Sequence, residues 1–296
     1  MDFLPLPDST ARQIIDATTV FNEHRRVKAL AATVAGGMYW KRQGAYEYLV
    51  RTQPDNKQAR IGARSAQTEA TYDDFTTRKL ATESRLKDLS TALLEATRLN
   101  KAVKAGRTPA LVVALLQTLD DAGLGAHFTV VGTHALYAYE TAAGVRIMAG
   151  ALATQDVDLL WDARKRVRFV SDLGRLDSSM LQVLQRADKT FERKAGQNET
   201  AINARGFEVD FLRRQPEGDD PHPFRFSADE ADLWPVQALR ASVLTNAPRF
   251  THPVISATGQ MAVMNTIAPA VFVEFKRWMA GSVRNSVCEA VLRIGC

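Results

Sequence analysis

The sequence predicts an α+β protein: a helical N-terminal region, then a mixed β-sheet flanked by helices, then C-terminal helices. Residues 57–104 are rich in Ala, Arg, Glu, Lys and Leu and lack proline, as long exposed helices do. Further along, short apolar runs such as Phe128–Val131 and Val157–Trp161 are separated by amphipathic stretches. Such an alternation is typical of strands connected by helices.

Length and composition are those of a globular protein. The chain has 296 residues, of which 46% are hydrophobic and 24% charged, so it can bury one large core or two ordinary ones. No run approaches the roughly 20 apolar residues of a membrane helix, and residues 1–8 do not resemble a secretory signal. The two cysteines, Cys288 and Cys296, lack metal-ligand spacing. We expect a cytoplasmic protein with reduced thiols and no membrane association.

Positive charge is concentrated in the N-terminal third. Residues 1–110 carry 18 Lys and Arg against 12 Asp and Glu, whereas the remaining 186 residues carry 20 against 21. This excess permits binding of RNA or another polyanion. A solvated helical surface is the simpler interpretation, so composition leaves the partner open.

Residues 1–107 are predicted to form a helical hairpin. A helical stripe begins near residue 9, is interrupted at Gly36-Gly37, and resumes over Met38–Val50. Residues 57–104 then carry a sparse apolar stripe among alternating charges, which indicates long helices packed on themselves or on a neighbour.

Residues 108–215 are predicted to form the α/β core. Its expected elements are a helix over Ala110–Ala122 with Thr108 as N-cap, a strand over Phe128–Val131, a helix over His134–Thr141, a strand over Val157–Trp161, a helix over Ser178–Arg186 and a strand over Phe207–Leu212. Residues 216–296 should be mostly helical, with helices over Pro235–Leu244 and Pro269–Ala280 and short extended pieces between them.

Three carboxylates interrupt the apolar strands of this core. Asp156 and Asp158 are separated by one residue, so on a strand both side chains point to the same face. Asp210 lies in a second such strand. Like charges held side by side repel unless a cation compensates them, and carboxylate oxygens suit Mg²⁺ bound to phosphates. The three together predict a metal site.

A Gly-Thr pair precedes the carboxylates at the end of the first core strand. Gly132 allows a phosphate to approach the main chain, and Thr133 adds a hydroxyl at the start of a helix, whose free N–H groups attract anions. Alone, such a pair is usually only a turn. His134, which follows it, is interpreted as a packing residue.

The combination of Gly132-Thr133, Asp156-Val157-Asp158 and Asp210 resembles the nucleotidyltransferase superfamily of the polymerase-β type. The surrounding residues look closest to bacterial nucleotidyltransferase-like proteins, many without an assigned substrate. The resemblance covers about residues 111–280. Two departures are Thr in place of the usual Ser at position 133 and a long interval before Asp156.

The resemblance implies a nucleotidyltransferase-like core and in-line transfer of a nucleotide from a nucleoside triphosphate. Asp156 and Asp158 would hold Mg²⁺ or Mn²⁺ on the triphosphate, and Asp210 would share a second metal and act as a candidate base. Gly132 and Thr133 would bind the β- and γ-phosphates. Lys276, on the last predicted helix, would also reach the phosphates, although a solvated surface lysine fits equally well.

Two functions therefore stay open. The first is a metal-dependent nucleotidyltransferase that acts on the hydroxyl of an RNA such as tRNA, a protein or a small molecule. The second is a binding or regulatory module of the same fold, for instance a component of a toxin–antitoxin pair, with the N-terminal region as its docking surface. Intact carboxylates favour the enzyme.

Overall fold

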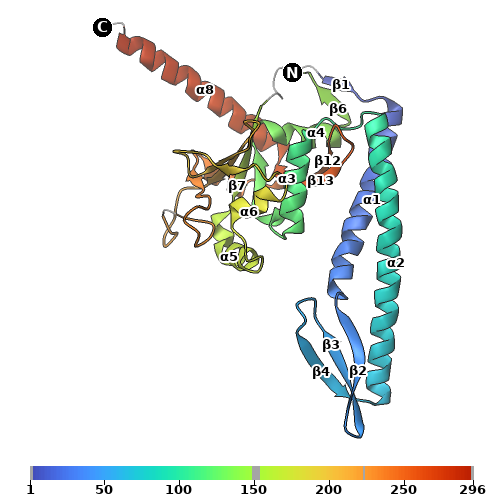
Figure 1. Ribbon diagram of the computed structural model, residues 1–296. Coiled ribbons are helices and arrows are strands. Elements are labelled where there is room, and N and C mark those ends of the chain that lie inside the picture. The colour runs from blue at the N-terminus through green and yellow to red at the C-terminus, as the bar shows by residue number, and fades with distance from the viewer. Residues whose placement is uncertain (1–2, 149–153, 223, 295–296) are drawn as a thin grey trace. The chain divides into compact units, whose positions relative to one another are not determined.

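A computed structural model describes residues 3–148, 154–222 and 224–294, with side chains described up to Gly281 (Figure 1). The chain divides into two compact units. Arg12–Val103 forms the first, here called the hairpin unit. Met1–Ala11 together with Lys104–Cys296 forms the second, here called the core unit.

A mixed sheet lies at the centre of the core unit, with the strand order β5-β7-β10-β9-β8 and a short strand, β11, that also pairs with β10. The two central strands, β7 and β10, are parallel, whereas β5 and β9 run antiparallel to them. The strands are β5 (Phe128–Val131), β7 (Asp156–Trp161), β8 (Glu192–Arg193), β9 (Thr200–Ile202), β10 (Glu208–Arg213) and β11 (Val236–Gln237). The predicted α+β class, with a mixed sheet after long helices, is confirmed.

Helices and two two-stranded sheets surround this sheet. The helices are α3 (Ala110–Asp121), α4 (Leu136–Ala143), α5 (Arg166–Gly174), α6 (Met180–Gln185), α7 (Ala241–Asn246) and α8 (Pro269–Ile294), with 3-10 turns at η1 (Gly125–His127), η2 (Thr133–Ala135) and η3 (Ala163–Lys165). One hairpin joins β12 (Arg249–Ile255) to β13 (Met261–Ile267), and β1 (Phe3–Pro5) pairs with β6 (Val145–Ile147). None of the described helices combines the length and apolar character that crossing a membrane requires.

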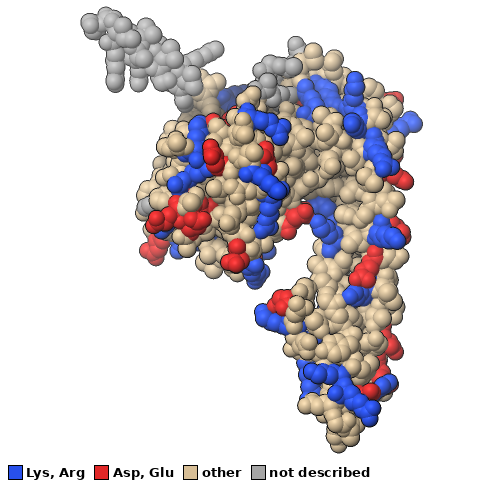
Figure 2. All heavy atoms as spheres, in the orientation of Figure 1, with Lys and Arg blue, Asp and Glu red and all other residues tan. Residues whose placement is uncertain are grey.

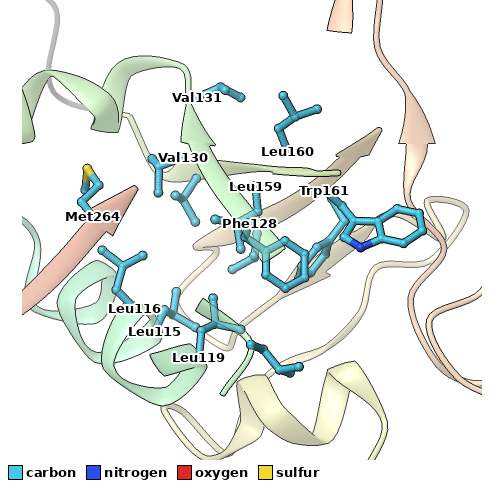
Figure 3. Packing of buried hydrophobic residues seen from close by; sticks show 14 of the residues in the cluster. Leu115, Leu116, Leu119, Phe128, Val130, Val131, Leu159, Leu160, Trp161 and Met264 are labelled. Atoms are coloured by element: carbon cyan, nitrogen blue, oxygen red, sulfur yellow. The ribbon is translucent and has the colours of Figure 1, made fainter. Parts of the chain in front are cut away.

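The main core lies between α3 and one face of the sheet (Figure 3). Leu115 and Leu119 of α3 and Val130 and Leu159 of the sheet are each no more than 2% exposed. An aromatic cluster continues this layer, with ring centroids 5.1–6.0 Å apart; its members are Phe128, Trp161, Phe169, Phe211 and Phe226. This close packing fixes the sheet from one side, which leaves the polar residues of β7 and β10 on its other face.

The hairpin unit contains two long antiparallel helices and a three-stranded sheet. Its helices are α1 (Asp8–Thr33), whose first residues belong to the core unit, and α2 (Ala66–Ala102), and its strands are β2 (Gly37–Gln43), β3 (Tyr46–Thr52) and β4 (Gln58–Ala63). Gln13 Nε2 donates to Asn100 Oδ1 at 3.0 Å, and the side chains of His24 and Ser90 are hydrogen-bonded at 3.2 Å. These two contacts pair α1 with the second half of α2 in antiparallel order.

The helix predicted over Met38–Val50 is wrong, because these residues form β2 and β3. Trp40 is half-buried between exposed Tyr39 and Lys41, which is the two-residue alternation of a strand rather than a helical stripe. The run is also rich in aromatic residues, which favour strands.

Two smaller predictions also need correction. The helix predicted over Pro235–Leu244 begins only at Ala241, because Val236 and Gln237 pair with the end of β10 instead. Thr108 does not cap α3: the residue before the helix is Pro109, which offers no side-chain cap. The backbone N–H of Thr108 instead donates to the carbonyl of Ile255 at 3.1 Å.

Candidate active site

Three carboxylates converge on the polar face of the two central strands. The parallel register places Asp210 directly beside Asp158, with Asp156 two residues before it on β7. Val157, between the first two aspartates, and Val209, just before the third, are buried on the opposite face. One oxygen from each of the three aspartates lies within 4.8 Å of the others. This spacing and this donor set fit a divalent metal ion, which prefers carboxylate oxygens.

Gly132 lies against this carboxylate group. It directly follows β5, whose last residue, Val131, pairs with Asp158. Its φ of +74° is in the region that favours glycine. A Cβ atom at this position would overlap Asp158 Oδ2. Glycine is therefore required here both by the backbone conformation and by the approach of the carboxylate.

Burial and neighbouring negative charges raise the pKa of two of these carboxyl groups, Asp158 and Asp210. Burial, followed by the charges of Asp156 and Asp210, raises the pKa of Asp158 to about 6. Burial also raises the pKa of Asp210, against a hydrogen bond from Thr200 that lowers it. A bound cation would favour the ionised forms that the protein environment disfavours.

The other predicted site residues lie around the same face. Thr133 is half-buried as the first residue of η2, directly after Gly132. Lys276, on α8, is half-buried with its Nζ 5.7 Å from the centre of the Phe272 ring. Its positive charge lowers the pKa of Asp158, against the larger effect of burial. The structure thus brings Lys276 within electrostatic reach of the carboxylates, while its role stays a prediction.

A family model described as Nucleotidyltransferase matches residues 110–287, which is more than half of the chain. The chain belongs to the nucleotidyltransferase family. Neither the comparison with curated proteins nor the comparison with solved structures found a match. Membership implies a nucleoside triphosphate as substrate, and the group formed by Asp156, Asp158 and Asp210 fits the metal-binding catalytic site that such a domain requires.

Two residues at the site of this nucleotidyltransferase were missed in the sequence. Thr200 lies opposite Asp210 on β9, and its Oγ1 donates to Asp210 Oδ1 at 2.5 Å. Glu208 is a fourth acidic residue on the same face, beside Asp156 in the register, and it pairs with Lys194 Nζ at 2.6 Å. Only the pairing of β9 with β10 reveals Thr200, since β9 is three residues long and carries no recognisable pattern.

His134 has the packing role expected of it. The side chain is 1% exposed, and its ring lies 5.7 Å from that of Tyr137 and 6.2 Å from that of Phe207. Burial lowers its pKa, against the charge and backbone hydrogen bond of Asp156. A neutral imidazole therefore supports the turn beneath Asp156.

Proposed function

We propose that the protein transfers a nucleoside monophosphate from a nucleoside triphosphate to an acceptor hydroxyl in a reaction that requires Mg²⁺ or Mn²⁺. The observation that carries this proposal is the convergence of Asp156, Asp158 and Asp210 within 4.8 Å. Like charges held this close on a half-buried surface lower stability unless a ligand compensates them. A divalent ion on a triphosphate is such a ligand.

The carboxylates divide between two tasks in this proposal. Asp156 and Asp158 would hold the metal that accompanies the triphosphate, and Asp210 would share a second metal and face the acceptor. The metal supplies a positive charge that stabilises the entering and leaving oxygens. Thr200 Oγ1 donates to Asp210 Oδ1 and would hold this carboxylate in position.

The chemical step forms a bond between the acceptor oxygen and the α-phosphorus. The bond between the α-phosphorus and its bridging oxygen breaks, and pyrophosphate leaves. The proton of the acceptor hydroxyl would go to the carboxylate of Asp210, which acts as the general base.

Gly132, Thr133 and Lys276 would bind the leaving phosphates. Gly132 leaves the main chain open to a phosphate oxygen, and the N–H groups of η2 together with the Thr133 hydroxyl are donors of the kind that bind phosphate. Lys276 would add a positive charge opposite Asp158. The acceptor would be an RNA such as tRNA, a protein or a small molecule.

Transfer of label tests this function. The protein is incubated with Mg²⁺, total RNA or cell lysate, and each of the four nucleoside triphosphates labelled at the α-phosphate. We expect label in an acceptor from at least one triphosphate, and none from the Asp156→Ala/Asp158→Ala double variant. Glu192→Ala, an exposed carboxylate on the edge strand β8, is the matched control and should keep full activity.

Two results would contradict the proposal. Absence of label from every triphosphate would favour a binding or regulatory module, such as one partner of a toxin–antitoxin pair. Equal transfer by the double variant would mean that a contaminant, or another site, performs the reaction.

A further inference from the structure

The three-stranded sheet of the hairpin unit has one covered face and a second face that is exposed except at Val50, which pairs with Tyr39 and is 5% exposed. Leu49 is fully buried and the ring of Trp40 lies 6.0 Å from that of Tyr72 on α2, so these residues define the covered face. Tyr39 is 38% exposed and Tyr46 is 64% exposed. Alternation along the strands places them on the other face.

The exposed face combines aromatic and basic side chains. Lys41 lies opposite Tyr48, and Tyr46 lies opposite Gln43, in the register of β2 and β3. Arg60 of β4 reaches over the Tyr48 ring, with its guanidinium carbon 3.1 Å from the ring centre. We call Tyr39, Lys41, Tyr46, Tyr48 and Arg60 the tyrosine face.

No carboxylate belongs to the tyrosine face among the described residues of β2, β3 and β4. The single acidic residue of these strands, Glu47, alternates to the covered side, where it pairs with Arg64 Nη1 at 2.6 Å. The hairpin unit as a whole carries 16 Lys and Arg against 10 Asp and Glu. Figure 2 shows positive and negative side chains interspersed over the surface of the hairpin unit. The tyrosine face differs from the rest of that surface because it has no carboxylate.

Such a face has the chemistry that single-stranded nucleic acid requires. Bases stack on exposed aromatic rings, and Lys and Arg neutralise the phosphates between them. Tyr39 and Gln43, the partner of Tyr46, are four residues apart on β2, which spaces the two ends of the face by about 13 Å. The face carries two cations, Lys41 and Arg60, and no carboxylate, so its charge favours a polyanion over a protein partner.

We propose that the tyrosine face binds single-stranded RNA, with Tyr39 and Tyr46 stacking on bases and Lys41 contacting a phosphate. This inference is independent of the transfer reaction, because it concerns a surface of the other unit and predicts binding without metal or triphosphate. If the transfer reaction holds as well, RNA becomes the favoured class of acceptor.

Fluorescence anisotropy of the full-length protein tests the inference. The probe is a labelled, unstructured RNA of about 12 nucleotides, within the usual size range of single-strand sites, in EDTA and at moderate salt. We expect Tyr39→Ala/Tyr46→Ala to bind about ten-fold or more weakly, and Tyr39→Phe/Tyr46→Phe, which keeps the rings, to bind as wild type does.

Charge is tested separately. Lys41→Ala should lower the slope of log affinity against log salt by about 0.7, the value for one phosphate contact with a single strand. The matched control is Arg78→Ala/Leu80→Ala, which removes one cation and one exposed apolar side chain from α2. This control should bind like the wild type, and circular dichroism should show that each variant is folded.

The inference would be overturned by no binding of RNA to the wild type, by no loss of affinity on removing both rings, by a loss of affinity in the phenylalanine variant, or by equally tight binding of duplex RNA. Binding of single-stranded DNA of the same sequence shows how far the protein recognises the sugar-phosphate backbone rather than the bases. Tighter binding of DNA than of RNA would also contradict the inference. The Asp156→Ala/Asp158→Ala variant should bind RNA normally, so the test is separate from that of the active site.

Discussion

In the core unit, the polar face of β7 and β10 holds three carboxylates together, whereas the exposed face of β2 and β3 alternates tyrosines with a lysine. The first arrangement repels itself: the charges of Asp156 and Asp210 add to burial in raising the pKa of Asp158 to about 6. The second is self-stabilising, since Arg60 stacks on Tyr48. A group of like charges that lowers stability implies a ligand more strongly than a group whose members already stabilise one another. The variants below test this difference.

The largest effect is expected at Asp158. Replacing it with Asn removes a repelling charge, so metal-free protein should gain up to about 3 kcal/mol of unfolding free energy at pH 8, the equivalent of raising a pKa from 3.8 to about 6. The pKa of Asp158 is higher in the folded than in the unfolded protein, so the unfolding free energy of the wild type falls as pH rises from about 4 to about 6 and Asp158 ionises. The gain should vanish below that window. Urea unfolding of both proteins in EDTA, at pH 8 and below about pH 4, measures this difference in unfolding free energy.

Asp172→Asn is the contrasting control for that experiment. A hydrogen bond from His127 Nε2, at 2.9 Å, lowers the pKa of Asp172, so this carboxylate stabilises the fold when ionised. The variant should therefore be less stable than the wild type at pH 8. A gain of stability at both positions would mean that loss of negative charge in general, rather than repulsion at the site, explains the first result.

Gly132→Ala should produce the next largest effect. The new Cβ would overlap the Asp158 carboxylate, and the backbone has a φ of +74°, so we expect a loss of about 2 kcal/mol and loss of nucleotide transfer. Gly144→Ala shares the positive φ, at +65°, but has open space around the new Cβ. It should lose some stability and keep its activity. Parallel melting curves and transfer assays compare the two.

Thr200→Val should have a smaller effect on stability and a specific one on proton transfer. It removes the donor to Asp210 Oδ1, which should cost about 1 kcal/mol and raise the pKa of Asp210 further. The acidic limb of the pH profile of kcat should therefore move to higher pH, while KM for the triphosphate changes little. Thr200→Ser keeps the hydroxyl and should restore the wild-type profile. An unchanged limb in the valine variant would contradict the assigned contact.

Arg60→Ala should produce the smallest change. It removes the cation over the Tyr48 ring, an exposed contact that contributes about 0.5–1 kcal/mol. Chemical denaturation should detect this loss of unfolding free energy. A stabilised variant would indicate that the tyrosine face, like the carboxylate group, is strained without a ligand, and the contrast between the two sheets would disappear.

Sequence reasoning located the carboxylates because their spacing is local. Asp156 and Asp158 are two residues apart on a strand, and Asp210 interrupts an apolar run, so each is visible without knowledge of the fold. Thr200 was missed because its contact with Asp210 depends on the pairing of β9 with β10. A three-residue strand is too short to show a pattern that predicts this pairing.

The N-terminal region shows a different limit. Composition predicts long helices over residues 57–104, of which Ala66–Ala102 forms one helix, α2, whereas Gln58–Ala63 forms the strand β4. The helix predicted over Met38–Val50 is likewise wrong, because this segment forms β2 and β3. Large apolar residues at Tyr39, Trp40, Tyr46 and Tyr48 fit either period over so short a stretch. The turn at Gly44 and the packing of Trp40 against Tyr72 decide for the strands, and packing between elements is not visible in a local window.

The central claim is that Asp156, Asp158 and Asp210 form a site for a divalent metal on a nucleotide, and thermal unfolding with added Mg²⁺ and a non-hydrolysable triphosphate at pH 8 tests it most directly. A ligand at about 100 times its Kd stabilises the folded state by about 2.7 kcal/mol, which raises Tm by several degrees. The wild type should show this rise with both ligands together, and Asp158→Asn should show almost none. Equal rises in the two proteins would contradict the claim.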